Sequence, residues 1–153
     1  MKIIIGADHG GFTFKEEVKK WLAGLGHDVK DIGAEKLDPD DDYVDYAALV
    51  AGELSDDESL KGVLFCRNGY GTMITANRVA GVRCGLAFDK LAVAKGRNDD
   101  DINCLSIPSD YLTLEQAKSM VSIFLETKFS DVERYKRRLW KLSTLSGGCC
   151  GGC

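Results

Sequence analysis

The sequence predicts an α/β fold, a three-layer α/β/α sandwich around a five-stranded parallel, Rossmann-like sheet. Short apolar runs alternate with stretches of helical periodicity, and the connections are long enough for right-handed crossovers. The runs at residues 3–5 (Ile-Ile-Ile) and 63–65 (Val-Leu-Phe) lack alternation, which is typical of strands buried on both faces. The chain has 153 residues, and we expect residues 1–145 to form one domain.

Each element has its own signal in the sequence. Strands are expected at residues 2–7, 27–32, 62–66, 82–88 and 102–107, because these runs are apolar or alternate. A first helix is expected from Phe14 to Leu25, where apolar residues repeat at helical spacing and Gly26 ends the helix. Further helices are expected at residues 43–54, from the glycine loop after residue 66 to about residue 78, from about residue 91, at 114–125 and at 131–142.

Composition excludes several classes of protein. Lys plus Arg number 20 and Asp plus Glu 24, a net charge of −4, which disfavours a general nucleic-acid binder or a binder of anionic membranes. No apolar run approaches membrane-spanning length. Because the first residues run directly into a strand pattern, we expect no secretory leader and a cytoplasmic location.

The six cysteines fall into two groups. Cys66, Cys84 and Cys104 stand singly in apolar stretches and are expected to be reduced. The other three, Cys149, Cys150 and Cys153, lie in a glycine-rich tail at residues 146–153. The tail is expected to be a flexible appendage rather than a metal or redox site, because its thiols lack the paired spacing of a zinc site.

Parallel sheets bind ligands beyond the carboxyl ends of their strands, which selects three segments: residues 8–11 (Asp-His-Gly-Gly), 66–71 (Cys-Arg-Asn-Gly-Tyr-Gly) and 97–99 (Arg-Asn-Asp). Cys66 ends a strand, and a glycine loop and a helix follow it. Free amides there favour a thiolate and can cradle an oxyanion, which suits nucleophilic attack or proton abstraction next to a carbonyl. The alternative is a buried structural cysteine.

The same loop departs from two known motifs. A cysteine phosphatase needs an arginine six residues after the cysteine, where this chain has Thr72. A dinucleotide fingerprint needs a third glycine, where this chain has Ile74, and it belongs after the first strand of its unit.

Two further groups have a functional and a structural interpretation. Asp8 and His9 can shuttle protons between hydroxyl groups, or Asp8 can cap the following helix. Arg134 and Arg138 share one helix face and suit a phosphate group, or they belong to a solvated helix that pairs with Glu133 and neighbouring acids.

From residue 1 to about residue 142 the chain resembles the type B ribose-5-phosphate isomerases and their galactose-6-phosphate isomerase relatives. The resemblance rests on the order and spacing of segments at residues 6–12, 42–47, 66–71, 76–83, 98–99 and 133–138. It implies aldose–ketose isomerisation of a sugar phosphate through a cis-enediolate, without metal or organic cofactor. It also implies a homodimer with shared active sites and leaves assembly into tetramers open.

The resemblance assigns roles to residues of this chain. Cys66 would be the general base, Asp8 would handle a hydroxyl proton, and Asn68 would offer a donor to the oxyanion. The implied substrate-binding residues are His9, Tyr43, Arg67, Gly69, Tyr70, Gly71, Arg97, Asn98, Arg134 and Arg138. The resemblance also implies a C-terminal helix that reaches the neighbouring subunit, so that Asn98, Arg134 and Arg138 would serve the partner's pocket.

The chain departs from the family pattern at several positions. Arg67 and Asn68 replace glycine and then threonine or serine, Arg97 replaces the histidine credited with ring opening, and Tyr135 replaces another histidine. Residues 106–111 replace a glycine-arginine segment. Two hypotheses follow: the substrate is open-chain or short, such as a tetrose phosphate, or Arg97 is an additional phosphate ligand. Alternatives to ribose 5-phosphate isomerisation are an isomerase for tetrose or hexose phosphates, a non-catalytic sugar-phosphate binding module and a thiol enzyme with a covalent Cys66 intermediate.

Overall fold

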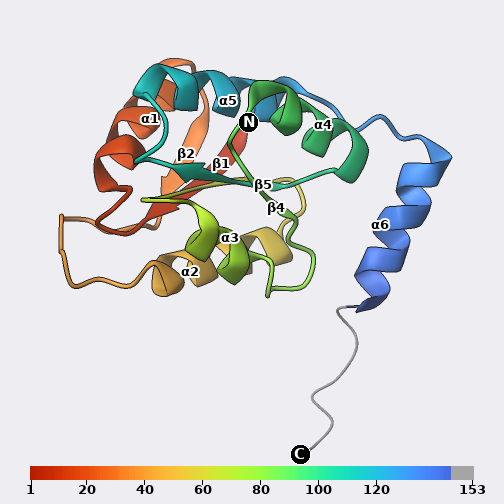
Figure 1. Cartoon of the computed structure of the whole chain (residues 1–153), viewed down its shortest axis with the longest axis horizontal. Coiled ribbons are helices and arrows are strands. Elements are labelled where there is room, and N and C mark those ends of the chain that lie inside the picture. Colours follow the sequence, from red (N-terminus) through yellow and green to blue (C-terminus); the bar gives the residue numbers. More distant parts are fainter. Residues whose placement is uncertain (146–153) are drawn as a thin grey trace, which may run out of the picture.

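The computed structural model describes residues 1–145, and the predicted tail at 146–153 lies outside them. Five parallel strands, β1 (Lys2–Ala7), β2 (Asp28–Asp31), β3 (Lys61–Cys66), β4 (Cys84–Leu86) and β5 (Cys104–Pro108), form one sheet. The helices are α1 (Phe12–Gly24), α2 (Tyr43–Asp56), α3 (Tyr70–Ala76), α4 (Lys90–Asp100), α5 (Leu114–Glu126) and α6 (Glu133–Leu145). Helices α1, α4 and α5 cover one face of the sheet and α2 and α3 the other, so the predicted three-layer sandwich is confirmed (Figure 1).

Each face of the sheet has its own apolar core. Ile3 and Ile5 of β1 pack toward α1 and α5, whereas Ile4 packs toward α2. All three side chains are fully buried, because a strand directs successive side chains to opposite faces and both faces are covered. The lack of apolar–polar alternation in this strand therefore correctly predicted that helices cover both faces of the sheet.

The strand order places two loops side by side. The order is β2-β1-β3-β5-β4, and Ala7 at the end of β1 pairs with Phe65 near the end of β3. The connections leave β1 and β3 toward opposite faces of the sheet, so their carboxyl ends flank a topological switch point. The β1–α1 and β3–α3 loops meet there.

Three predicted boundaries differ from the structure for local reasons. Strand β4 is shorter than residues 82–88, because it is an edge strand that pairs only with β5. Helix α3 ends at Ala76, since the side chain of Asn77 exchanges two hydrogen bonds with the backbone of Cys84. Helix α6 begins at Glu133 rather than 131, because Asp131 has a φ of 59°.

A buried lysine connects α1 to β2. Only 1% of Lys15 is exposed, and its Nζ donates to both carboxylate oxygens of Asp31 at 3.0 and 2.8 Å and to the carbonyl of Ala34 at 2.7 Å. Lys19 also donates to Asp31, at 2.6 Å. Burial acts to raise the pKa of Asp31, but the bonds from the two lysines and the amide of Gly33 outweigh it, and the net pKa is lowered.

Helix α6 stands apart from the sheet (Figure 1) and packs chiefly against α4. Tyr135 is its only buried residue, and Trp140, Leu142 and Leu145 are exposed. A short helix with so little burial is marginal in water by itself. Within residues 1–145, every helix is too short or too polar to cross a lipid bilayer.

Candidate active site

Cys66 ends β3 at the switch point, and its sulfur faces the glycine loop. The side chain is 5% exposed, and Sγ accepts a hydrogen bond from the amide of Gly69 at 3.2 Å. Gly69 has a φ of 76°, and a Cβ there would lie 2.4 Å from Cδ1 of Leu86. Only glycine therefore fits the turn that directs this amide at the sulfur.

Two buried hydroxyl groups hold the carbonyl of Gly69. Ser106 Oγ on β5 donates to it at 2.7 Å, and Thr72 Oγ1 on α3 donates to it at 3.2 Å. The two hydroxyl oxygens also lie 2.8 Å apart, so the two hydroxyl protons are shared among these three contacts and form one network beneath the loop. This network fixes the peptide plane that joins Gly69 to Tyr70, and it thereby holds the Cα from which the Gly69 amide points toward Cys66. We call this pair of hydroxyl groups the Ser106–Thr72 clamp.

Several amides of the loop remain open. Those of Gly71 and Thr72 lie in the first turn of α3 and make no hydrogen bond within the described residues. Asn68 Oδ1 accepts the amide of Tyr70 at 3.0 Å, so the carboxamide is held by its oxygen, with its NH2 group as a donor. Open amides beside a thiol form an arrangement that can stabilise a developing oxyanion.

Asp8 follows β1 and lies one step beyond the Ala7–Phe65 register pair, beside Cys66 across the sheet. Its Oδ1 accepts the amide of Gly11 at 3.1 Å, so it supports the start of α1, although the first residue before the helix is Gly11 itself. Asp8 is buried, and burial raises its pKa despite the bond from Gly11 and the charge of His9. Asp8 is therefore not the N-cap of α1, although it holds the amide of the N-cap residue Gly11, and burial raises the pKa of its carboxyl group.

Two glycines bring the β1–α1 loop against β3. A Cβ on Gly11 would lie 2.3 Å from the main-chain carbonyl of Phe65, and one on Gly10 would lie 2.6 Å from Cγ of Arg67. The stem of Arg67 thus covers Gly10, while its guanidinium approaches Asp110 at 3.8 Å and is largely exposed. The positive charge of Arg67 lies at the rim of the site.

His9 is held by a residue that the sequence does not single out. Oδ1 of Asp41 accepts the His9 amide at 2.9 Å and lies 2.7 Å from its ring Nδ1. The hydrogen bond to Asp41 raises the pKa of His9, and the charge of Asp8 acts in the same direction. The only signal in the sequence is an acidic loop before Tyr43.

Tyrosines frame the loop. The ring of Tyr43 lies against Gly71, where a Cβ would be 2.6 Å from its Cε2. Tyr70 is exposed, as are Phe88 after β4 and Tyr111 after β5. The carboxyl edge of the sheet therefore carries a rim of uncovered aromatic side chains around the Cys66 loop.

The remaining predicted residues form a second group. Arg134 and Arg138 on α6 lie over the ring of Tyr135, and the charge of Asp99 on α4 acts on Arg134. Asn98 Nδ2 donates to the carbonyl of Lys128 at 3.4 Å. Helix α6 projects from the side of the molecule away from α1 (Figure 1), so this group does not meet Cys66 within one chain.

Arg97 lies in the second group but is turned inward. It is buried and donates to Asp101 at 2.7 Å, to the carbonyl of Ile102 and to the carbonyl of Thr127 at 3.3 Å. Its guanidinium also lies 5.7 Å from the ring centre of Phe124. Arg97 thus ties the end of α4 to the end of α5, and its predicted contact with substrate stays a prediction.

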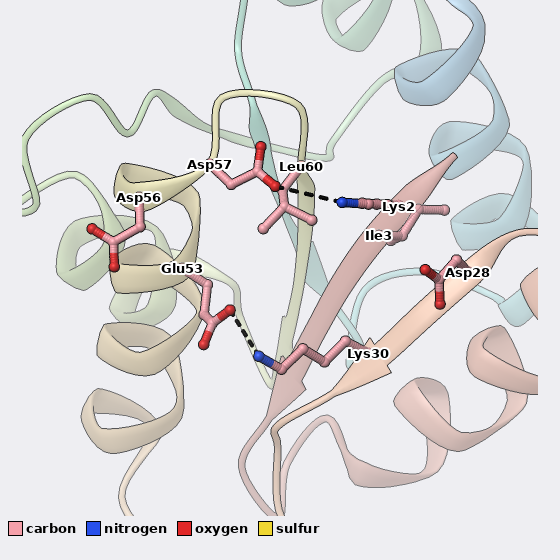
Figure 2. Close-up of a pocket in the computed structure, with 8 residues that line it drawn as sticks. All are labelled: Lys2, Ile3, Asp28, Lys30, Glu53, Asp56, Asp57 and Leu60. Carbon is pink, nitrogen blue, oxygen red and sulfur yellow. Dashed lines mark hydrogen bonds and ion pairs between the residues drawn. The ribbon is translucent and has the colours of Figure 1, made fainter.

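A hollow of about 280 Å³ lies at the opposite edge of the sheet (Figure 2). Two ion pairs cross it, Lys2 with Asp57 at 3.9 Å and Lys30 with Glu53 at 2.8 Å. Its lysines are already neutralised, and it lies at the amino ends of the strands, where ligands of such sheets rarely bind. The Cys66 loop is therefore the better candidate for chemistry.

The chain is similar to known proteins along almost its whole length. The family model described as Ribose/Galactose Isomerase matches residues 3–142. Ribose-5-phosphate isomerase B of Mycobacterium tuberculosis is 32% identical over 139 residues, which cover 91% of this chain and 86% of that protein.

Solved structures agree. The crystal structure of ribose-5-phosphate isomerase B from Mycoplasma genitalium with bound ribulose-5-phosphate superposes with a TM-score of 0.92 at 31% identity, covering 97% of each chain. The Thermotoga maritima ribose 5-phosphate isomerase gives a TM-score of 0.89 at 35% identity, covering 94% of this chain and 97% of that one. With sequence and fold in agreement over these lengths, the chain belongs to the ribose/galactose isomerase family.

Proposed function

We propose that this chain interconverts an aldose phosphate and a ketose phosphate, ribose 5-phosphate and ribulose 5-phosphate first among them, and that it uses no metal or organic cofactor. The observation that carries the proposal is the Cys66 thiol at the switch point of the sheet, which accepts a hydrogen bond from the amide of Gly69 and ends the strand next to the one that Asp8 follows. The ribulose-5-phosphate in the Mycoplasma genitalium relative supports the choice of sugar.

The proposed chemistry is a proton shift between two carbons. Cys66, as a thiolate, removes the proton from C2 of the open-chain aldose, and the C–H electron pair forms the double bond of a cis-enediolate. The amides around Gly69 and Gly71 and the NH2 group of Asn68 stabilise the negative oxygen. Cys66 returns the proton to C1, while Asp8 carries the hydroxyl proton from O2 to O1.

Replacing the sulfur tests the proposal. Cys66→Ala should abolish exchange of the C2 hydrogen with deuterated solvent, while calorimetry still detects binding of ribulose 5-phosphate. Cys84→Ala removes a buried thiol from a different strand and should retain the exchange. Exchange at the wild-type rate in Cys66→Ala would contradict the assignment of the base.

We also propose that two copies share each site. Trp140, Leu142 and Leu145 of α6 are exposed, and the aromatic rim around the Cys66 loop is uncovered as well. If α6 of one copy packs on the rim of the other, both surfaces are buried, and Arg134 and Arg138 arrive where a sugar phosphate needs cations. This arrangement accounts for a basic helix that stands away from its own sheet.

Mixed dimers test the sharing. Cys66→Ala and Arg138→Ala should each be inactive alone. Co-expressed, they should recover about a quarter of wild-type activity, since half of randomly mixed dimers are heterodimers with one intact site of two. Light scattering should first show whether the wild type and both variants form dimers. No recovery in dimers that have demonstrably mixed would mean that each site is built from one chain.

Arg97 bears on the choice of sugar. Its bonds to Asp101, Ile102 and Thr127 occupy it inside the chain, and a guanidinium stays protonated. We propose that the substrate needs no proton transfer at this position, which favours open-chain or four-carbon sugar phosphates as additional substrates. Turnover measured for tetrose, pentose and hexose phosphates tests this. Binding without turnover of any of them would instead favour a non-catalytic binding module.

A further inference from the structure

Asp41 is a buried carboxylate that holds both the main chain and the ring of His9. It lies in the loop between β2 and α2, its side chain is 8% exposed, and its Oδ1 engages both the amide and the ring Nδ1 of His9, 32 positions away. Two bonds from one oxygen fix the main chain and the ring of His9 together. A contact that served only to hold the loop would need just the amide.

The second oxygen of Asp41 requires a positive charge nearby. Oδ2 is buried and has no hydrogen-bond partner within the described residues. A buried carboxylate in this state is costly unless a cation faces it. Tyr46 of α2 also lies near Asp41. Burial, then the charge of Asp41 and a side-chain hydrogen bond to it, raise the pKa of Tyr46, so the phenol supplies no positive charge. The ring of His9, 2.7 Å from Oδ1, is the group placed to supply one.

The other charges that face His9 come from two loops. Asp8 precedes it in the β1–α1 loop, and Arg67 approaches from the β3–α3 loop. The guanidinium of Arg67 opposes a proton on His9 but is largely exposed, whereas both carboxylates are buried. Buried charges act more strongly than solvated ones, so the balance favours the imidazolium.

We propose that Asp41 is a positioning residue that binds Nδ1 of His9 and thereby leaves Nε2–H as a fixed donor to an oxygen of the substrate. Within residues 1–145, Nε2 has no other hydrogen-bond partner. His27, the only other histidine, precedes β2 at the opposite edge of the sheet. The donation to substrate rests on the proposed function, whereas the Asp41–His9 pair does not.

Nuclear magnetic resonance tests the pair without any turnover. The chain has two histidines, so a His27→Gln variant assigns the ring signals of His9. In the wild type His9 should titrate above the ordinary pH range of histidine, and in Asp41→Asn it should titrate at lower pH. Asp40→Asn removes an exposed carboxylate of the same loop and should leave the titration unchanged. If His9 of the wild type titrates in the ordinary pH range of histidine, the proposed Asp41–His9 ion pair is wrong. This result does not depend on whether the protein is an isomerase or on the folding of any Asp41 variant.

Ligand titrations test the donor. Inorganic phosphate and unphosphorylated ribose serve as separate probes, and the one that perturbs the His9 signals identifies which oxygen accepts the hydrogen bond. With sugar phosphate, kcat/KM should fall on the alkaline side as His9 loses its proton. This fall should move to lower pH in Asp41→Asn, with KM about tenfold higher at neutral pH. If neither probe perturbs His9 while Cys66-dependent exchange persists, the donor is wrong and the proposed function stands.

Discussion

The Ser106–Thr72 clamp allows the orientation of one amide to be tested against activity. Ser106→Ala removes the 2.7 Å bond to the Gly69 carbonyl, but Thr72 and the amide of Met73 still bond to it, so no buried group is left without a partner. The loss of unfolding free energy should therefore be about 1 kcal/mol. Thr72→Val should cost a similar amount, since Ser106 then remains.

The double variant is more informative. With Ser106→Ala and Thr72→Val together, the Gly69 carbonyl keeps only the Met73 amide. Residues of one network are coupled, so the double variant should lose more stability than the sum of the single variants, by about 0.5–3 kcal/mol. The clamp fixes the peptide plane between Gly69 and Tyr70, and the Gly69 amide is held through the shared Cα. If the loop shifts, a misplaced donor at Cys66 should lower kcat about 10- to 100-fold with little change in KM.

A matched control separates loop orientation from general loss of stability. Asn103 is a buried side chain that bonds to the backbone of Arg83 at 2.8 Å and of Gly81 at 2.9 Å, at the amino edge of the sheet. Asn103→Ala should destabilise the fold at least as much but leave kcat unchanged. Urea unfolding and steady-state kinetics measure both quantities. A double clamp variant with wild-type kcat, or an Asn103→Ala variant with the same loss of kcat, would refute the reasoning.

Three further predictions concern charge and assembly. Asp31→Asn should lower the free energy of unfolding by about 3 kcal/mol at neutral pH, because it removes the main carboxylate facing buried Lys15. Since the folded-state pKa of Asp31 is lowered, this stabilisation is present above the ordinary carboxyl pKa of 3.8 and is lost in more acidic solution. Urea titrations should therefore show that the difference in stability between wild type and variant shrinks below that pH. Trp140→Glu places a charge at a position that is 66% exposed in the single chain, and it should weaken dimer association at least about 100-fold. Light scattering should then show monomers, and an unchanged mass would contradict the proposed interface. Burial raises the pKa of Asp8, so the acidic limb of the pH–rate profile should lie at higher pH than an ordinary aspartate would give. Asp8→Asn should abolish this limb, and a limb that persists in the variant would belong to another group.

The sequence was sufficient for the fold because the signals it uses are local. Five apolar runs gave five strands, and Gly26, with a φ of 84°, follows the end of α1 as expected. Two of the errors concern ends that depend on partners distant in the sequence. No local pattern reveals that the side chain of Asn77 pairs with the backbone of Cys84 and ends α3, or that β4 has a neighbour on one side only.

The same limit explains the site residues that sequence reasoning missed. Asp41 lies 32 positions from His9, and Ser106 lies 37 positions from Gly69. Several carboxylates occupy the loop before Tyr43, and only the folded chain selects the one that meets the imidazole. Arg97 is a different case, because its partner Asp101 stands only four residues later, directly after the end of α4, where it accepts a bond from the guanidinium at 2.7 Å.

The three internal cysteines illustrate what strand direction adds to composition. All three stand in apolar runs and are buried, so hydrophobicity alone cannot rank them. Cys84 and Cys104 begin β4 and β5 and pair with each other in register, and this contact, together with complete burial, raises the pKa of the Cys104 thiol well above its usual value. Cys66 ends β3 instead, where a parallel sheet presents amides and loops to a ligand. A thiol at the amino edge is thus kept neutral in the core, whereas the thiol at the carboxyl edge receives a hydrogen bond from the amide of Gly69, and this difference follows from the order of residues along each strand.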